Sequence, residues 1–123
     1  MKITLLSEDS IRLEPQPGRL TIEAPYEKME YSPFHMLASS LATCSWSVLA
    51  SWASNSDIDV ADLVIEVNWE FADNPNRVGR MDMRLDWPSL PPARIEVARR
   101  AAALCAIHAS LSHPTEVRIG VGQ

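Results

Sequence analysis

Hydrophobic and polar residues follow two different periods along the chain, and these periods predict its elements. Residues 63–71 and 80–87 alternate strictly, with apolar side chains on one side and polar or charged ones on the other. A period of two is typical of strands that have one face in water, and residues 72–79 are predicted to be the hairpin loop between them. Three further short strands are predicted over residues 2–6, 10–14 and 19–24.

The stretch from Ser32 to residue 56 has the spacing of a helix instead. Ser32 is a favourable N-cap, and Pro33 suits the first helical position. An apolar stripe follows at intervals of three and four residues, which is the helical period, and the helix is expected to end near residues 54–56. The stripe places Cys44 in the middle of the helix on its apolar face, and its members are Leu37, Leu41, Cys44, Val48 and Trp52.

The C-terminal third predicts a second helix over residues 92–105, because Ile95, Ala98, Ala102 and Cys105 form one apolar stripe. A short helical stretch over 106–112 and a last strand over 115–121 are predicted to follow, with Val117, Ile119 and Val121 facing inward. The resulting order, βββ-α-ββ-α-β, predicts one α+β domain over residues 1–123. The first helix has little polar surface for so small a monomer, so we expect a homodimer that buries it.

Composition narrows the class of protein. The chain has 123 residues, of which 46% are hydrophobic and 22% charged, as in an ordinary globular domain. A net charge of -5 without clustered cations argues against nucleic-acid partners and anionic membrane surfaces. Residues 31–56 carry no charge and are long enough to cross a bilayer, but their many Ser and Thr residues favour a buried helix. The N-terminus does not resemble a signal peptide, so a cytoplasmic protein is predicted.

Two cysteines are the residues with the clearest potential for chemistry. In a reducing compartment they are either inert buried thiols or a redox pair, in which one thiol attacks an oxidant and the other resolves the product. Cys44 lies about three turns into its helix, where the helix dipole offers little help. Cys105 lies at the predicted C-terminal end of its helix, where the dipole disfavours a thiolate, which suits a resolving role. His108, one turn further on, is a candidate hydrogen-bond donor to Cys105.

A metal site is the weaker alternative for the same residues. Cys44, Cys105, His35, His108 and His113 are the available ligands, but none of them forms the closely spaced pairs that are usual in metal sites. The sequence also contains no glycine-rich phosphate loop. Neither a metal nor a cofactor is therefore predicted.

Two segments resemble the cysteine helices of the OsmC/Ohr family, the osmotically inducible protein C and organic hydroperoxide resistance proteins. The first runs from Ser32-Pro33 to Cys44. The second is Leu104-Cys105-Ala106-Ile107-His108-Ala109-Ser110-Leu111, where the family typically has Cys-Pro-Val/Ile-His/Ser-x-x-Leu. The resemblance spans roughly residues 10–121. It implies an intertwined homodimer with central helices flanked by sheets and with active sites at the subunit interface.

The resemblance also implies an activity. Cys44 would attack an organic or inorganic hydroperoxide and become a sulfenic acid, Cys105 would resolve it as a disulfide, and an external dithiol reductant would restore both thiols. In peroxidase members a Glu positions an Arg that stabilises the attacking thiolate. Phe34 and His35 stand where that Glu is expected, and Arg12 and Arg19 are the candidates for the Arg.

These departures from the family pattern, together with Ala106 in place of the usual Pro, predict a peroxidase activity that is weak. A second hypothesis is a binding module of the same fold, in which the cysteines only pack and the dimer interface holds a small apolar ligand. The candidate walls of a substrate or ligand pocket are Phe34, His35, Met36, Trp46 and His108.

Overall fold

The computed structural model describes residues 2–7, 10–14 and 33–122, in two units that divide at residue 32. In the N-terminal unit, β1 (Lys2–Ser7) pairs antiparallel with β2 (Ser10–Glu14). This hairpin confirms the first two predicted strands. The predicted third strand, residues 19–24, lies outside the described residues.

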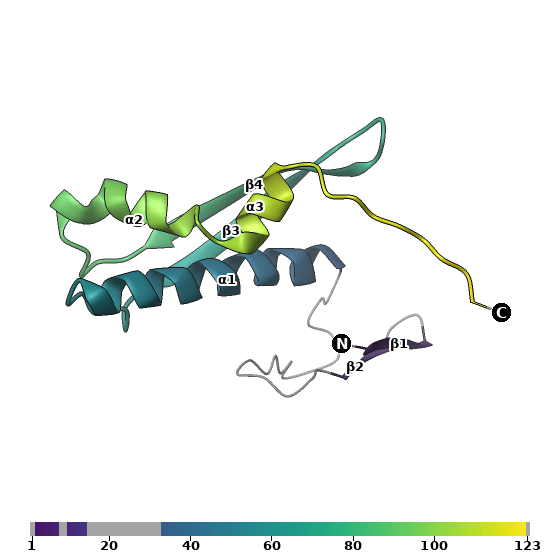
Figure 1. Ribbon diagram of the computed structural model, residues 1–123, viewed down its shortest axis with the longest axis horizontal. Coiled ribbons are helices and arrows are strands. Elements are labelled where there is room, and N and C mark those ends of the chain that lie inside the picture. Colours follow the sequence, from purple (N-terminus) through teal and green to yellow (C-terminus); the bar gives the residue numbers. More distant parts are fainter. Residues whose placement is uncertain (1, 8–9, 15–32, 123) are drawn as a thin grey trace. The chain divides into compact units, whose positions relative to one another are not determined.

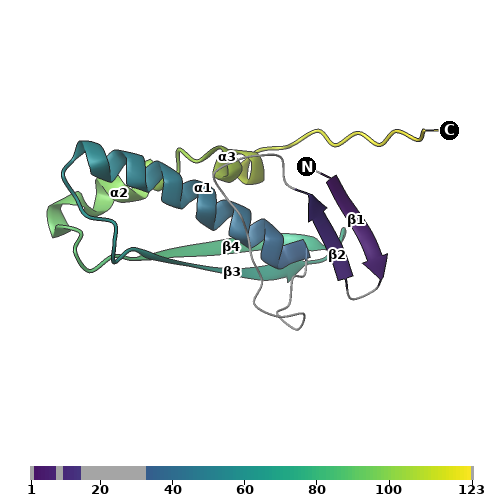
Figure 2. The same cartoon turned by 90° about the horizontal axis from the view of Figure 1, so that it is seen from below.

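The C-terminal unit is a two-stranded antiparallel hairpin with helices on one of its faces, so the chain is of the α+β class (Figures 1 and 2). The long first helix packs against the hairpin and against both later helices. The elements of this unit are α1 (Pro33–Asn55), β3 (Val64–Ala72), β4 (Arg77–Asp86), the 3₁₀ turn η1 (Pro92–Arg94), α2 (Ile95–Ala102) and α3 (Ala106–Ser112).

The β3–β4 hairpin follows the predicted alternation over most of its length. On its outer face Glu66 pairs with Arg84, and Glu70 pairs with Arg80, so opposite charges lie across the ladder. The register shifts between Glu70 and Phe71, because β4 contributes one extra residue there. Phe71 follows the bulge and is 57% exposed, although its ring still contacts Phe34 of α1 on the inner face of the hairpin.

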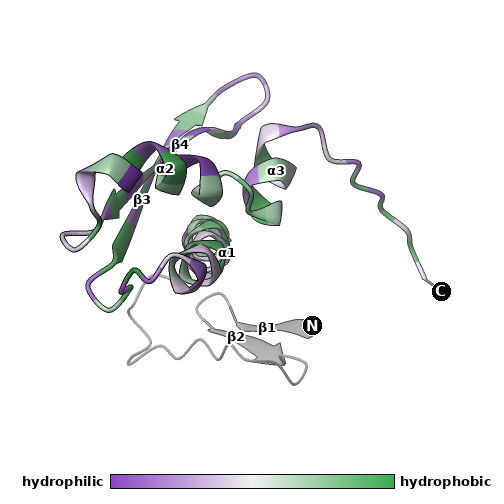
Figure 3. Ribbon diagram, turned by 60° about the vertical axis from the view of Figure 1, so that its left-hand side comes forward, coloured by the Kyte–Doolittle hydropathy of each residue, from purple (hydrophilic) through white to green (hydrophobic). Residues whose placement is uncertain are grey.

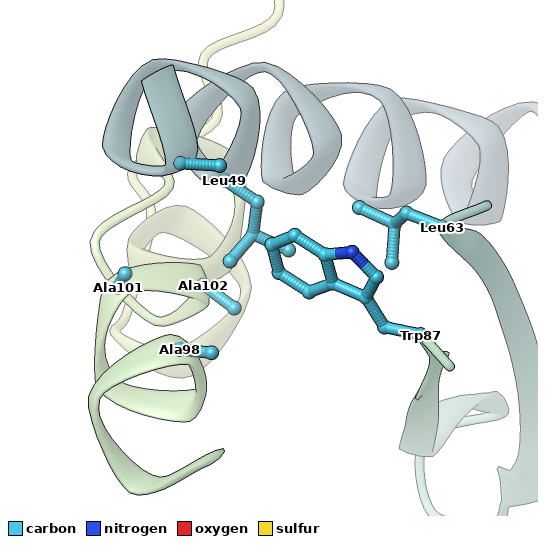
Figure 4. Packing of buried hydrophobic residues seen from close by; sticks show 7 residues of the cluster. Leu49, Leu63, Trp87, Ala98, Ala101 and Ala102 are labelled. Atoms are coloured by element: carbon cyan, nitrogen blue, oxygen red, sulfur yellow. The ribbon is translucent and has the colours of Figure 1, made fainter. Parts of the chain in front are cut away.

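The core of this unit lies between α1, α2 and the base of the hairpin (Figure 4). Trp87 is its largest member and lies between Leu49 of α1 and Leu63, with the alanines of α2 opposite. The indole N–H of Trp87 donates to the Asp59 carbonyl over 2.9 Å, so the ring is also anchored by its polar atom. The buried residues of the cluster are Leu49, Ala53, Leu63, Trp87, Ala98, Ala101 and Ala102.

The buried face of α1 differs from the predicted one. It shares Leu41 with the predicted stripe and otherwise lies one residue further along, at Ala38, Ser45, Leu49 and Ala53. Leu41 and Leu49 are buried together with three small residues, whereas Leu37, Val48 and Trp52 stay half-exposed. Green and pale colours alternate along α1 in Figure 3, because serine and threonine residues lie among its apolar ones. The prediction that Cys44 lies on the buried face is therefore wrong by one position.

The predicted helix over residues 92–105 is divided into shorter pieces. Pro92 begins a 3₁₀ turn, and α2 then ends at Ala102. The Leu104 N–H donates to the Ala101 carbonyl and that of Cys105 donates to Ala102, a tightened i to i−3 pattern typical of a helix end. The chain turns there, exposes Leu104 and buries Cys105. The short helix predicted after it is confirmed as α3.

The last predicted strand, residues 115–121, is not formed within this chain. The segment after α3 runs away from the helices without a ladder to any described strand (Figure 1). Val117, Ile119 and Val121 are therefore exposed instead of facing inward, with 91% of Ile119 accessible. A strand requires a partner edge, and within the described residues this segment has none.

We predict that Gly79→Ala destabilises the protein, because Gly79 is the extra residue of the β4 bulge. A Cβ atom there would lie 2.6 Å from the Ala72 Cβ, so the hairpin would have to shift. We expect a loss of about 1–3 kcal/mol in the free energy of unfolding, measured by urea denaturation. Gly120→Ala is the matched control, since its new methyl group meets nothing within 4 Å. Equal stability of the two variants would contradict a close approach at the bulge.

Candidate functional site

The structure brings the two cysteines together. Cys44 lies in the middle of α1, Cys105 immediately precedes α3, and these two helices pack against each other. The Cys44 thiol is close enough to the Cys105 sulfur to lower the pKa of Cys105. Both thiols are free; Cys44 is half-buried, whereas Cys105 is 0% exposed. One thiol of the pair can therefore be reached from solvent, and the other is enclosed behind it.

Cys105 is the N-cap of α3 and not the end of the preceding helix. Its backbone is extended, and its sulfur accepts a hydrogen bond from the His108 N–H at 3.4 Å. The expectation that a helix C-terminus disfavours a thiolate at Cys105 is therefore wrong, because α2 ends three residues earlier. His108 does donate to Cys105, but through its backbone; its ring Nδ1 lies 3.4 Å from the Ser112 hydroxyl.

The surroundings of Cys105 favour its charged form. Burial raises the pKa of the Cys105 thiol, since a buried thiolate is poorly solvated. The His108 N–H, which donates to the sulfur, and the nearby Cys44 thiol, Ser45 hydroxyl and Ile107 N–H act in the opposite direction and outweigh burial. The pKa of Cys105 is therefore lower than that of an ordinary cysteine, and a thiolate is available closer to neutral pH.

Ser45 is the site residue that the pattern analysis missed. It follows Cys44 directly, but its side chain belongs to the buried stripe of α1 and is 0% exposed. The signal was present in the sequence, because Ser45 stands between Leu41 and Leu49 at the four-residue spacing of one helix face. Apolar residues were given more weight than small residues, so a polar residue on a core face was not identified.

The proposed pocket residues lie at separate places on α1. Phe34 packs edge-on against Phe71, and His35 packs edge-on against Trp69, each with ring centroids 4.9 Å apart. Both residues therefore contact β3. Trp46 is 43% exposed on another face of the helix. Met36 is half-buried, and its carbonyl accepts a hydrogen bond from the Ser40 hydroxyl at 3.0 Å.

The candidate arginines belong to the N-terminal unit. Arg12 lies on β2, opposite Thr4 of β1. Arg19 lies outside the described residues. In the part of the chain that the structure describes, no group of three or more Cys, His, Asp or Glu side chains is arranged to hold a metal ion. No helix within the same ranges is long and apolar enough to cross a membrane.

Two cavities lie close to the cysteine pair in the C-terminal unit. One has a volume of about 470 Å³ and lies between the start of α1, β4 and α3; Phe34, Leu41, His108 and Leu111 are among its lining residues. The other, of about 680 Å³, lies between β4 and α2. Leu41, Met81 and His108 line both. His108, whose N–H donates to the Cys105 sulfur, therefore lies at the walls of both cavities.

Comparisons with known proteins agree on one family. A family model described as "OsmC-like protein" matches residues 26–120. A crystal structure from Psychrobacter arcticus 273-4, of a protein named for osmotic stress induction and a detoxification response, is similar at 27% sequence identity and a TM-score of 0.63. The match covers 71% of this chain and 64% of that one, so the likeness spans less than two thirds of that protein. No curated protein matches the sequence.

We predict that the ionisation of Cys105 links stability to pH. Because the pKa of Cys105 is lowered on folding, the native state releases its proton at a lower pH than the unfolded chain, whose cysteines titrate near pH 8.5. The stabilisation is full above that pH and is lost as pH falls through the native pKa. Within this window the free energy of unfolding should rise with pH, by at most about 1.4 kcal/mol per pH unit.

The measurement is denaturant unfolding of the reduced protein between pH 6 and pH 9. Cys105→Ser is the matched variant, because serine keeps an N-cap side chain but does not titrate. The difference in stability between the parent and this variant should change with pH only within the window. A constant difference would mean that folding leaves the ionisation of Cys105 unchanged.

Proposed function

The chain belongs to the OsmC-like protein family, and from this premise we propose that it is a thiol-dependent hydroperoxide reductase. The observation that carries the proposal is the contact between the two free thiols, one half-buried and one enclosed. A peroxidase with two cysteines needs an accessible thiol for the oxidant and a second thiol within reach of the first. Inert packing cysteines have no need of hydrogen bonds that favour a thiolate.

The proposed cycle has three balanced steps. The Cys44 thiolate attacks the terminal oxygen of a hydroperoxide ROOH, the O–O bond breaks, and the products are Cys44 sulfenic acid and an alkoxide, which takes a proton to become ROH. The Cys105 thiolate then attacks the sulfenic sulfur, forms the disulfide and expels hydroxide, which becomes water. An external dithiol finally reduces the disulfide to two thiols and is itself oxidised to a disulfide.

The difference in exposure supports this division of roles. The side chain of Cys44 is partly accessible, so an oxidant can reach it, whereas the fully buried Cys105 meets only its neighbours. Disulfide closure requires a thiolate at the resolving position. The polar groups around Cys105 lower its pKa and so increase the fraction that is thiolate. The lowered pKa is thus suited to the second step, and accessibility is suited to the first.

The proposed substrates are organic or inorganic hydroperoxides. The apolar cavities next to the pair favour organic ones, because they offer a surface for an alkyl or aryl group. Phe34 and His35 occupy the positions of the family Glu and pack on β3, so we expect slower turnover than in members that carry that Glu. The need for a dithiol reductant fits a reducing, cytoplasmic compartment.

We propose a homodimer as the working unit. The segment after α3 presents alternate apolar side chains without a partner among the described residues, and large apolar residues of α1 stay half-exposed. Exposed apolar surface of this kind is typical of faces that a second chain covers. A second copy that pairs with residues 115–121 would supply the missing strand partner.

The second candidate function is binding of a small apolar ligand without catalysis. Its support is the pair of cavities with largely apolar walls, whose volumes are typical of ligand sites. Native protein would be denatured and its extract examined by mass spectrometry. A recurring stoichiometric ligand would favour binding, and an empty protein across several preparations would count against it.

The test of the peroxidase is thiol counting under denaturing conditions before and after one equivalent of cumene hydroperoxide. The parent should lose both thiols and form one intramolecular disulfide. Cys105→Ser should accumulate a Cys44 sulfenic acid that a dimedone-type reagent traps, because the resolving thiol is absent. Cys44→Ser should react at least tenfold more slowly, since its remaining thiol is enclosed. Survival of both thiols in the parent would disprove the peroxidase.

We also predict that the apolar segment holds the dimer together. The double variant Val117→Lys, Ile119→Lys should sediment as a single chain where the parent has the mass of two, because it places charges in a buried interface. Arg118→Ser is the control on the opposite side of the same extended segment, where Arg118 pairs with Glu116 at 2.8 Å. Analytical ultracentrifugation gives the masses, and a dimeric double variant would exclude this segment from the interface.

A further inference from the structure

We propose that Ser45 is a positioning residue that holds the Cys105 thiolate by a hydrogen bond during disulfide closure. The role in disulfide closure rests on the proposed peroxidase function, but the hydrogen bond between Ser45 and the Cys105 thiolate does not. The inference begins from a buried hydroxyl that has no partner where its neighbours have one. It assigns a task to a residue that the cysteine motif alone does not single out.

The hydroxyl of Ser45 differs from those of Ser40 and Ser47 in its hydrogen bonding. Ser40 and Ser47, on the exposed side of the same helix, donate to the carbonyls of Met36 and Thr43 at 3.0 and 3.1 Å. Such a bond to the carbonyl four residues back is the usual choice for serine within a helix. Ser45 is 0% exposed, and its oxygen has no hydrogen-bond partner within the described part of the chain. A buried hydroxyl without a partner is costly, so it calls for an explanation.

The explanation is the ionisation state of the sulfur beside it. Ser45 is one of the groups that lower the pKa of Cys105, so its hydroxyl is near that sulfur although it makes no close hydrogen bond to the neutral thiol. A thiol sulfur is a weak acceptor, whereas a thiolate is a strong one. The hydroxyl is therefore unsatisfied while Cys105 is protonated, and gains an acceptor when Cys105 ionises.

The order of the chemistry makes Ser45 more important in the second step than in the first. In the reduced protein the Cys44 thiol is also one of the groups that lower the pKa of Cys105. Once Cys44 has become a sulfenic acid, this S–H is gone, and Cys105 must attack at that moment. The donors then left around the thiolate are the Ser45 hydroxyl and the N–H groups of Ile107 and His108. Of these three donors only Ser45 uses its side chain, so it is the one that a substitution can remove.

Ser45→Ala removes the hydroxyl without threatening the fold, because alanine is the best helix former and eliminates an unsatisfied buried group. Ser47→Ala is the matched control on the exposed face of the same helix. The first measurement is thiolate absorbance near 240 nm against pH in the reduced proteins. We expect about tenfold less Cys105 thiolate in Ser45→Ala below its pKa, the size expected for one hydrogen bond to a charged group. Ser47→Ala should titrate as the parent does.

The second measurement is single-turnover oxidation by cumene hydroperoxide between pH 6 and pH 9, with sulfenic acid and disulfide followed separately. Formation of the sulfenic acid should be unaffected in Ser45→Ala. In this variant disulfide closure should be about three- to fourfold slower at low pH. The smaller fraction of Cys105 thiolate there outweighs the greater nucleophilicity of that more basic thiolate. At high pH it should equal or exceed the parent rate by up to about threefold, because a more basic thiolate is the better nucleophile.

The outcomes separate this inference from the proposed function. A parent that consumes no hydroperoxide, while Ser45→Ala still changes the thiolate titration, defeats the peroxidase and leaves the Ser45–Cys105 hydrogen bond intact. An unchanged titration in a folded Ser45→Ala overturns the inference, whatever the activity. A closure rate that falls equally at every pH also overturns it, because a packing role alone would produce that result.

Discussion

The approach of α1 to the two short helices is the constraint on which the rest of the structure depends. It is possible because the facing residues are small: Ala38, Ser45 and Ala53 on α1, with Ala98 and Ala102 on α2. Helices with small side chains at their contact can pack closely. A leucine in place of Ser45 would separate α1 from α3 and, with them, the two sulfur atoms. The proximity of the two cysteines is thus a consequence of helix packing as much as of their places in the sequence.

The same packing divides the site into an accessible part and an enclosed part. Cys44 lies beside the buried stripe of α1 and keeps some contact with solvent, whereas Cys105 lies within the interface. In the proposed peroxidase, the peroxide needs access to one thiol and the resolving thiolate needs stabilisation. These two demands conflict at a single sulfur atom. Two cysteines on two helices meet both demands. The arrangement explains why burial at Cys105 comes with several hydrogen-bond donors.

The sequence predicted elements better than it predicted their faces and ends. Alternation located β3 and β4, because one wet face leaves a clear period of two. The bulge at Gly79 leaves no such period in the sequence, and the exposure of Phe71 at the far end of the hairpin is not encoded in the alternation either. In α1 large apolar residues suggested one buried stripe, but contact with α3 selected the smaller neighbours. The N-cap role of Cys105 depends on where α2 ends, and the apolar stripe continues past that point.

The cap at the start of α3 has a thermodynamic consequence for the redox pair. The Cys105 sulfur that receives the His108 N–H in the reduced protein would also be the atom that joins Cys44 in a disulfide. A disulfide sulfur is a poorer acceptor than a thiolate, so closure weakens the first turn of α3. Whatever strengthens that turn stabilises the dithiol form and raises the reduction potential of the couple. In the proposed cycle, the reduction potential of the Cys44–Cys105 couple would therefore be set partly by the stability of a seven-residue helix.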